Sequence, residues 1–189
     1  RYGDMFSWYQ EAMAQMHFTH LIRPAQPELY VFTASGNPGE AQERAFTDTN
    51  LRVDPLLDMW QKEDLRRERL AMDFRIDPVD AESWREFIAK LFDKAEAMGA
   101  VGTKQLHAYL RDLDYRETRD EDVVWRGDLS PEQIRVFQDW VMNACFAEDN
   151  KRGWTHQCHI GTHNLTGSSP MPLERIARRY PKCDFVLLH

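Results

Sequence analysis

Helix-like and strand-like runs alternate along most of this chain, and this order constrains the fold more than any other feature of the sequence. Short apolar or mixed runs are separated by longer runs whose apolar residues recur every three or four positions. The Asn-Gly and Asp-Gly turns that are typical of β-hairpins are absent. The alternation therefore predicts an α/β fold in which helices connect parallel strands.

Five short strands are predicted, over residues 18–22, 50–53, 100–103, 155–159 and 185–189. Lys104 follows the third strand, and the last two strands end in His159 and His189. Residues at the carboxyl ends of parallel strands face the ligand site in α/β proteins. These three side chains are therefore predicted to converge on one site.

The predicted helices have recognisable ends in two cases. The helix over residues 80–98 is followed by Gly99, a residue that favours the conformation found just after a helix. Ser130 followed by Pro131 is a typical helix start, and this helix is predicted to run to about residue 148. Further helices are predicted over residues 2–16, 56–72 and 172–179, and residues 25–50 are predicted mostly as loop. In the helix over residues 56–72, the charged residues Arg66, Arg67, Glu68 and Arg69 are predicted to lie on a solvated face.

Composition and charge narrow the class of protein. The hydrophobic and charged fractions, 42% and 29%, are those of an ordinary globular domain. A net charge of −7 without any basic run argues against a nucleic-acid partner. No apolar run has membrane-spanning length and no signal peptide is recognised, so no membrane partner is expected. Cys145, Cys158 and Cys183 are an odd number without metal-site spacing, which is typical of buried thiols in a reducing, cytoplasmic compartment.

Three segments resemble amidohydrolase-related proteins, in particular the branch also found fused to glutamine-synthetase-like domains. Residues 98–113, Met-Gly-Ala-Val-Gly-Thr-Lys-Gln-Leu-His-Ala-Tyr-Leu-Arg-Asp-Leu, resemble the fourth-strand segment of that family. Residues 157–161, Gln-Cys-His-Ile-Gly, resemble its fifth strand, and residues 172–189, ending Val-Leu-Leu-His, its sixth. The resemblance covers about residues 84–189. It implies a (β/α)8 TIM barrel, of which residues 1–189 would form a single partial domain holding about strands 2–6.

The resemblance also implies a metal site. His159 matches a metal-ligand histidine of the family, and His189 would be a second ligand or would orient a substrate carbonyl. Lys104 matches a lysine that is carboxylated and bridges two metals in some members, whereas an unmodified ammonium there would bind a substrate anion. Zinc is the expected ion, with manganese as the alternative. Arg111 is a candidate for binding a substrate carboxylate, because a planar guanidinium matches a carboxylate bidentately. A salt bridge that anchors a helix is the alternative role.

The other histidines are assigned to the surface or to loops: His17, His20, His107, His156 and His163. Asp54 ends a predicted strand and is assigned to a cap of the turn before Leu56.

The chain departs from the family pattern at two ligand positions. The family's His-x-His pair at the first strand and aspartate at the eighth have no counterpart here, and His17 and His20 have the wrong spacing. On this mapping, the first strand would precede Arg1 and the seventh and eighth would follow His189. We therefore expect the sequence to be part of a longer domain.

The expected function is that of a metal-dependent hydrolase. Metal-activated water would attack a C–N or ester bond of a small, carboxylate-bearing substrate. Two alternatives stay open, because a fold does not fix a reaction. One is a metal-dependent decarboxylase, lyase or isomerase on the same barrel, and the other is a non-catalytic α/β domain with structural histidines. A homo-oligomer also stays open.

Overall fold

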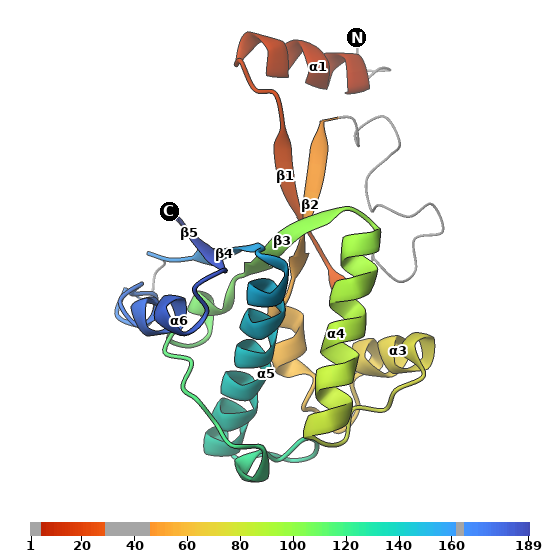
Figure 1. The fold of residues 1–189 in the computed structure, drawn as a ribbon, viewed down its shortest axis with the longest axis vertical. Helices are drawn as coiled ribbons and strands as arrows, with labels where there is room; N and C mark the ends of the chain where they lie inside the picture. Colours follow the sequence, from red (N-terminus) through yellow and green to blue (C-terminus); the bar gives the residue numbers. More distant parts are fainter. Residues whose placement is uncertain (1–4, 29–45, 162–164) are drawn as a thin grey trace.

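Five parallel strands form one sheet in the computed structural model, which describes residues 5–28, 46–161 and 165–189. The strands lie side by side in their sequence order (Figure 1), and each is parallel to the next. They are β1 (Leu21–Ala25), β2 (Thr47–Arg52), β3 (Ala100–Gln105), β4 (Thr155–His159) and β5 (Asp184–Leu188). Consecutive parallel order is that of a TIM-barrel wall, and it differs from a doubly wound sheet, whose strand order reverses.

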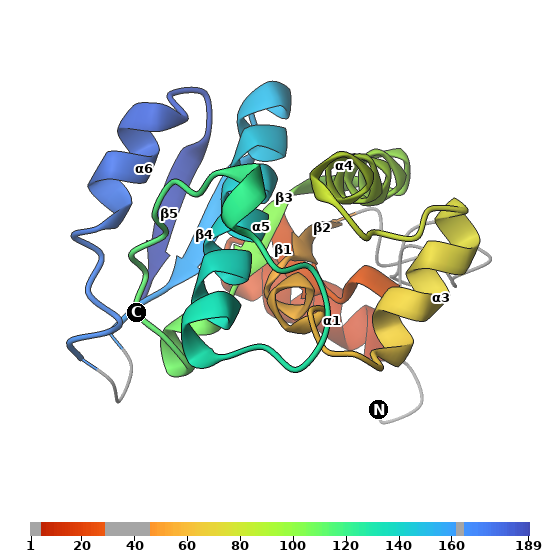
Figure 2. The same cartoon turned by 90° about the horizontal axis from the view of Figure 1, so that it is seen from below.

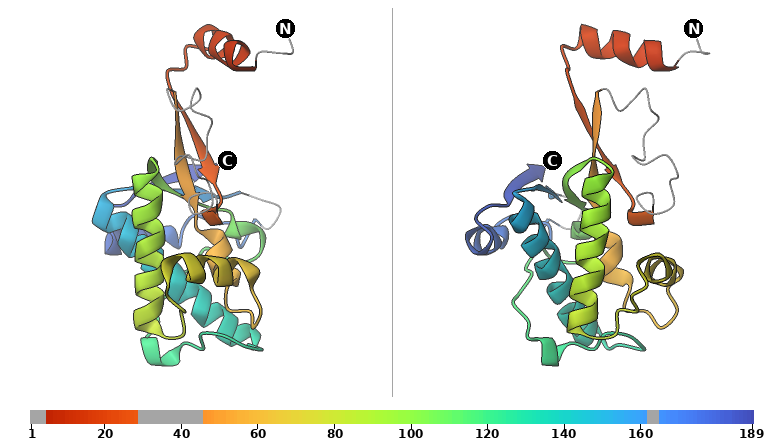
Figure 3. Two further views of the ribbon diagram at one scale, coloured as in Figure 1. Left: turned by 90° about the vertical axis from the view of Figure 1, so that its right-hand side faces the viewer. Right: turned by 45° about the vertical axis from the view of Figure 1, so that its right-hand side comes forward.

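Helices connect the strands, as the alternation predicts. α3 (Leu65–Phe74) and α4 (Ala81–Ala97) lie between β2 and β3, α5 (Pro131–Arg152) between β3 and β4, and α6 (Leu173–Arg179) between β4 and β5. α4 and α5 run side by side against the sheet (Figures 1 and 2). Fully buried apolar side chains fill the space between these helices and the sheet, among them Leu51, Trp84, Phe87, Phe92 and Phe137. α1 (Met5–Gln15) stands apart from this body, beyond the ends of β1 and β2 (Figure 3).

Both predicted helix starts are confirmed. The Asp80 side chain accepts a hydrogen bond from the backbone N–H of Ser83, and Ser130 and Gln133 form a reciprocal capping box at α5. α5 continues to Arg152, a turn beyond the predicted end, and stops at Gly153, whose φ is 65°. The additional turn carries Asp149, which becomes fully buried.

The helix predicted over residues 56–72 is wrong in its first half. A 3-10 helix, η2 (Asp54–Asp58), comes first, and α3 begins only after Asp64, whose side chain accepts from the Arg67 backbone N–H. Arg67 was predicted to be solvated and is 1% exposed. Its guanidinium donates to the carbonyls of Gln61, 2.5 Å, and Lys62, 3.0 Å, and also to that of Met59. These hydrogen bonds tie the Arg67 guanidinium to carbonyls within residues 59–62, in the segment between η2 and α3.

The first strand is also displaced from its prediction. It covers Leu21–Ala25 instead of residues 18–22, and it includes Pro24. β1 pairs with β2 on one side only in the described part of the chain. Proline, which lacks an N–H donor, is tolerated on such a strand. The loop predicted over residues 25–50 lies mostly outside the described residues. Within those residues, no helix is long and apolar enough to cross a membrane.

Candidate functional site

The three predicted strand-end residues lie at one edge of the sheet. Side chains alternate between the two faces of a strand. Thr103 of β3 and His156 of β4 contact Asp149 of α5, so these two face the helices. Lys104 and His159, at odd offsets from them, therefore face the opposite side of the sheet. Both are largely buried, with 6% and 8% of their surface exposed.

His159 lies at the centre of this group. Its ring centroid is 4.5 Å from that of His189, which follows β5, with the two planes 69° apart. On another side it stacks on Tyr109 at 4.7 Å, with the planes 25° apart. Tyr109 belongs to η3 (His107–Tyr109), a short 3-10 helix that follows β3. The ends of three adjacent strands thus contribute to one cluster of rings.

Electrostatics keep the His159 imidazole neutral. Burial lowers the pKa of His159, and the nearby His189 and Lys104 lower it further. Burial also lowers the pKa of Lys104, as does Arg52, while Cys158 and Asp54 act in the opposite direction. A neutral imidazole carries the lone pair that a metal ion requires. The environment of His159 is therefore suitable for a ligand.

Two further charged residues at this edge were not singled out from the sequence as site residues. Arg52, the last residue of β2, donates from Nε to Asp54 Oδ1 at 2.7 Å and from Nη2 to Oδ2 at 2.5 Å. Asp54 was interpreted as a cap for the following turn. The sequence feature that could have identified them is a pair of opposite charges, Arg52 and Asp54, at the end of a buried strand. This strand neighbours the one that carries Lys104.

His107 and His156 were assigned to the surface or to loops, and both assignments are wrong. His107 is 2% exposed, and burial lowers its pKa to about 4. Neither of its ring nitrogens has a hydrogen-bond partner among the described residues. His156 is fully buried beneath α5. Each lies close to an end of a strand. At such positions, the sequence alone does not show which helix or loop packs over the side chain. His163 lies outside the described residues.

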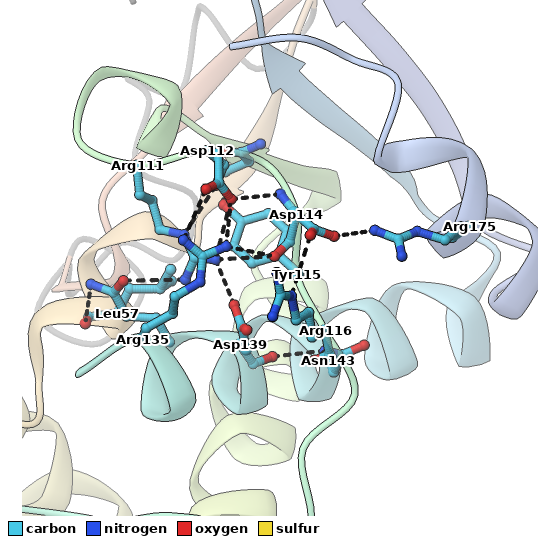
Figure 4. A network of polar contacts seen from close by, with 12 residues as sticks. Leu57, Arg111, Asp112, Asp114, Tyr115, Arg116, Arg135, Asp139, Asn143 and Arg175 are labelled. Atoms are coloured by element: carbon cyan, nitrogen blue, oxygen red, sulfur yellow. Dashed lines mark hydrogen bonds and ion pairs between the residues drawn. The ribbon is translucent and has the colours of Figure 1, made fainter. Parts of the chain in front are cut away.

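Arg111 belongs to a network that ties the loop after η3 to α5 (Figure 4). Its Nη2 donates to Asp139 Oδ1 at 2.5 Å, and Nη1 donates to Gln138 at 3.2 Å. The guanidinium lies 4.6 Å from the centroid of the Tyr115 ring. Arg135 holds Asp112 of the same loop with two hydrogen bonds. These contacts are those of the helix-anchoring alternative, and a role of Arg111 in substrate binding stays a prediction.

The side chains at the strand ends are of a type that binds divalent metals, but they are fewer than a complete metal site requires. His159 and His189 offer two imidazoles within ring contact. Protein zinc sites use three or four side-chain ligands. Among the described residues, no group of three or more histidine, cysteine, aspartate or glutamate side chains is arranged to hold a metal ion.

Comparisons with known proteins identify solved structures that have a similar fold. No protein-family model matches the chain, and no curated protein matches it. Uronate isomerase from Thermotoga maritima matches 89% of the chain with a TM-score of 0.68 and 14% identity. Glucuronate isomerase from Caulobacter crescentus matches 94% with a TM-score of 0.65 and 16% identity. A protein assigned provisionally as a metal-dependent hydrolase, from Lactobacillus casei, matches 97% with a TM-score of 0.63 and 15% identity.

The chain spans less than half the length of each of these structures, between 42% and 48%. At this level of identity the likeness concerns the fold. It agrees with the consecutive parallel order of the five strands. The chain therefore has an α/β fold that forms part of a TIM barrel.

Proposed function

We propose that this chain forms part of a metal-dependent enzyme of the amidohydrolase type, with its active site at the carboxyl ends of β2 to β5. Its reaction would be hydrolysis of a C–N or ester bond in a small, carboxylate-bearing substrate. The observation that carries the proposal is the contact between His159 and His189, with Lys104 beside them, at the ends of three adjacent parallel strands. The amidohydrolase assignment and its fusion branch rest on the sequence resemblance.

His159 and His189 would hold the metal. A bound divalent metal supplies a Lewis acid and lowers the pKa of a coordinated water to roughly 7. Tyr109 stacks on His159 and restricts the orientation of its ring. Lys104 lies close enough to lower the pKa of His159. It would act as an ammonium toward substrate or, if carboxylated, as a further ligand.

The charges at the strand ends favour an anionic substrate. Arg52 and Lys104 bring two positive charges, and Asp54 brings one negative charge that is already paired with Arg52. A guanidinium has five N–H donors, and the pair with Asp54 uses the Nε and Nη2 groups. Donors of Arg52 and the Lys104 ammonium would bind a substrate carboxylate. This assignment adds Arg52 to Lys104 and Arg111, for which the sequence already proposed binding of a substrate anion or carboxylate.

Isomerisation of a sugar acid is the second candidate reaction. Two of the three solved structures named above are uronate or glucuronate isomerases. A uronate carries the carboxylate that Arg52 and Lys104 would bind, so the same charges suit both reactions. The likeness supports an isomerase as much as a hydrolase.

The test uses the full-length protein, with metal content measured by mass spectrometry and turnover measured on two panels. One panel holds N-acyl amino acids and carboxylate esters, and the other holds uronates. His159→Ala should lose metal and nearly all turnover. His20→Ala is the matched control, because His20 is an exposed histidine paired with Asp48 beside the start of β1. A His159→Ala protein with full metal content and full activity would refute the proposed site.

A further inference from the structure

A buried hydrogen-bonded cluster joins β3, α5 and β4 on the face of the sheet opposite the candidate site. Its members are Thr103, Asp149 and His156, whose side chains are fully buried. Thr103 Oγ1 lies 2.7 Å from Asp149 Oδ2 and 2.7 Å from His156 Nδ1. The third side of the triangle, from His156 Nδ1 to Asp149 Oδ2, is 3.0 Å. Each member therefore contacts both of the others.

The number of hydrogens available in the cluster determines which groups donate and which accept. A carboxylate only accepts, and the single hydrogen of the Thr103 hydroxyl is directed to it. His156 Nδ1 must then carry its own hydrogen, which it shares between the carboxylate and the hydroxyl oxygen. These three contacts form together only when all three groups keep their positions, and Asp149 Oδ1 and His156 Nε2 have no hydrogen-bond partner among the described residues.

The pKa values of His156 and Asp149 depend on each other. Burial lowers the pKa of His156, but Cys158 and the hydrogen-bonded Asp149 outweigh this effect and raise it to about 9. Burial raises the pKa of Asp149 as well, while its hydrogen bonds to His156 and Thr103 lower it. The two groups form a buried pair, with His156 Nδ1 3.0 Å from Asp149 Oδ2. A buried ion pair contributes little net stability compared with apolar side chains of the same volume. Its value is better explained by the single arrangement that it permits.

Each member is linked through the backbone to the candidate site. Thr103 directly precedes Lys104, and His156 lies three residues before His159 on the same strand. Asp149 lies in the last turn of α5, and its carbonyl accepts from the backbone N–H of Trp154, 2.9 Å away, where the chain turns into β4. The cluster thus fixes both strands to the same turn of one helix.

We propose that Thr103, Asp149 and His156 are positioning residues that set the placement of Lys104 relative to His159. None of the three touches the candidate site, so they act through the strands that carry these two residues. The inference rests on the proposed function insofar as Lys104 and His159 serve substrate and metal. Partners that contact metal ligands directly change metal affinity by about 10- to 100-fold when they are removed. This cluster acts through the backbone, so its effect is expected at the lower end of that range.

The deciding variant is Thr103→Val, which removes the hydroxyl and keeps the shape of the side chain. Thr103→Ser restores the hydroxyl and serves as the rescue. Thr49→Val is the matched control, because Thr49 is a buried threonine on β2 whose hydroxyl has no partner among the described residues. If Thr103→Val does not fold, Thr103→Ala and Thr103→Ser give the same comparison, since both lack the methyl group and differ in the hydroxyl.

Two measurements on the full-length protein separate this inference from the proposed function. Titration with Zn²⁺ alone should show about tenfold weaker binding in Thr103→Val, with rescue in Thr103→Ser and no change in Thr49→Val. Amide hydrogen exchange should become faster at Lys104 and His159 in Thr103→Val and stay unchanged in Thr49→Val.

Unchanged exchange at Lys104 and His159, together with a lower melting temperature, would overturn the inference and leave the cluster a purely stabilising role. If the wild-type protein binds no Zn²⁺ or Mn²⁺, the proposed function fails. Faster exchange confined to the Thr103 variant would still support the positioning role in that case.

Discussion

Buried polar residues on the two faces of β3 and β4 differ in whether they have polar partners. On the helix-facing side, Thr103, Asp149 and His156 are hydrogen-bonded to one another in a closed triangle. On the other side, Lys104 and His159 are almost as buried, but neither forms an ion pair with a carboxylate within the described ranges. A charge that is buried without a partner costs free energy. The first face therefore fixes geometry, and the second is suited to receive a ligand.

Replacing Asp149 by alanine should have the largest effect on stability, because it leaves the buried His156 ring and Thr103 hydroxyl without their shared acceptor. We expect a loss of about 3–5 kcal/mol in the free energy of unfolding, measured by urea denaturation. Asp73→Ala, which removes an exposed aspartate of α3, is the control and should change it by less than about 0.5 kcal/mol. A loss of similar size in both variants would remove the contrast between the two faces.

His107 sharpens the comparison, since it is a buried histidine of the opposite kind. Its pKa is about 4 in the folded protein and 6.5 in the reference state. Between these values the unfolded chain binds the extra proton, so stability rises with pH and is lost as the pH falls from 6.5 toward 4. The expected loss is about 3 kcal/mol.

The measurement for His107 is urea unfolding at several pH values from 7.5 to 4.5. His107→Leu should flatten the slope below pH 6.5, because it removes the imidazole that titrates. The variant should still fold, because the ring nitrogens of His107 have no hydrogen bond to lose among the described residues. Met72→Leu, at an exposed residue of α3 that carries no titratable group, should keep the slope. A slope that is identical in wild type and His107→Leu would show that His107 does not titrate differently on folding.

The smallest effect is expected at Lys104. Lys104→Met keeps the length of the side chain and removes a buried positive charge beside His159. If the face that carries Lys104 and His159 is adapted to a ligand and is therefore less stable, the variant should gain about 1 kcal/mol in the free energy of unfolding. The same variant should lose turnover. Thermal unfolding and kinetics on the same preparation test both parts. A clear loss of stability would mean that the ammonium already has a stabilising partner.

Much of the fold and the outline of the site could be predicted from the sequence, because these features depend on local pattern. Alternating helix-like and strand-like runs predicted connected parallel strands, and Asp80 and Ser130 start the two main helices as capping chemistry requires. The boundaries of β4 were predicted correctly. The strand-end residues Lys104 and His159 are close together, as the carboxyl-end rule predicted.

Only the tertiary structure decided which of these polar residues are buried, and against what. Thr103 meets Asp149 from 46 positions away and His156 from 53. Arg67 leaves the predicted solvated face because carbonyls of the preceding loop fold over its guanidinium. The burial of His107, and the anchoring of Arg111 to Asp139, likewise depend on the docking of separate segments. Local periodicity assigns a residue to an element and a face, whereas its partners are supplied by chain that is distant in sequence and adjacent only after folding.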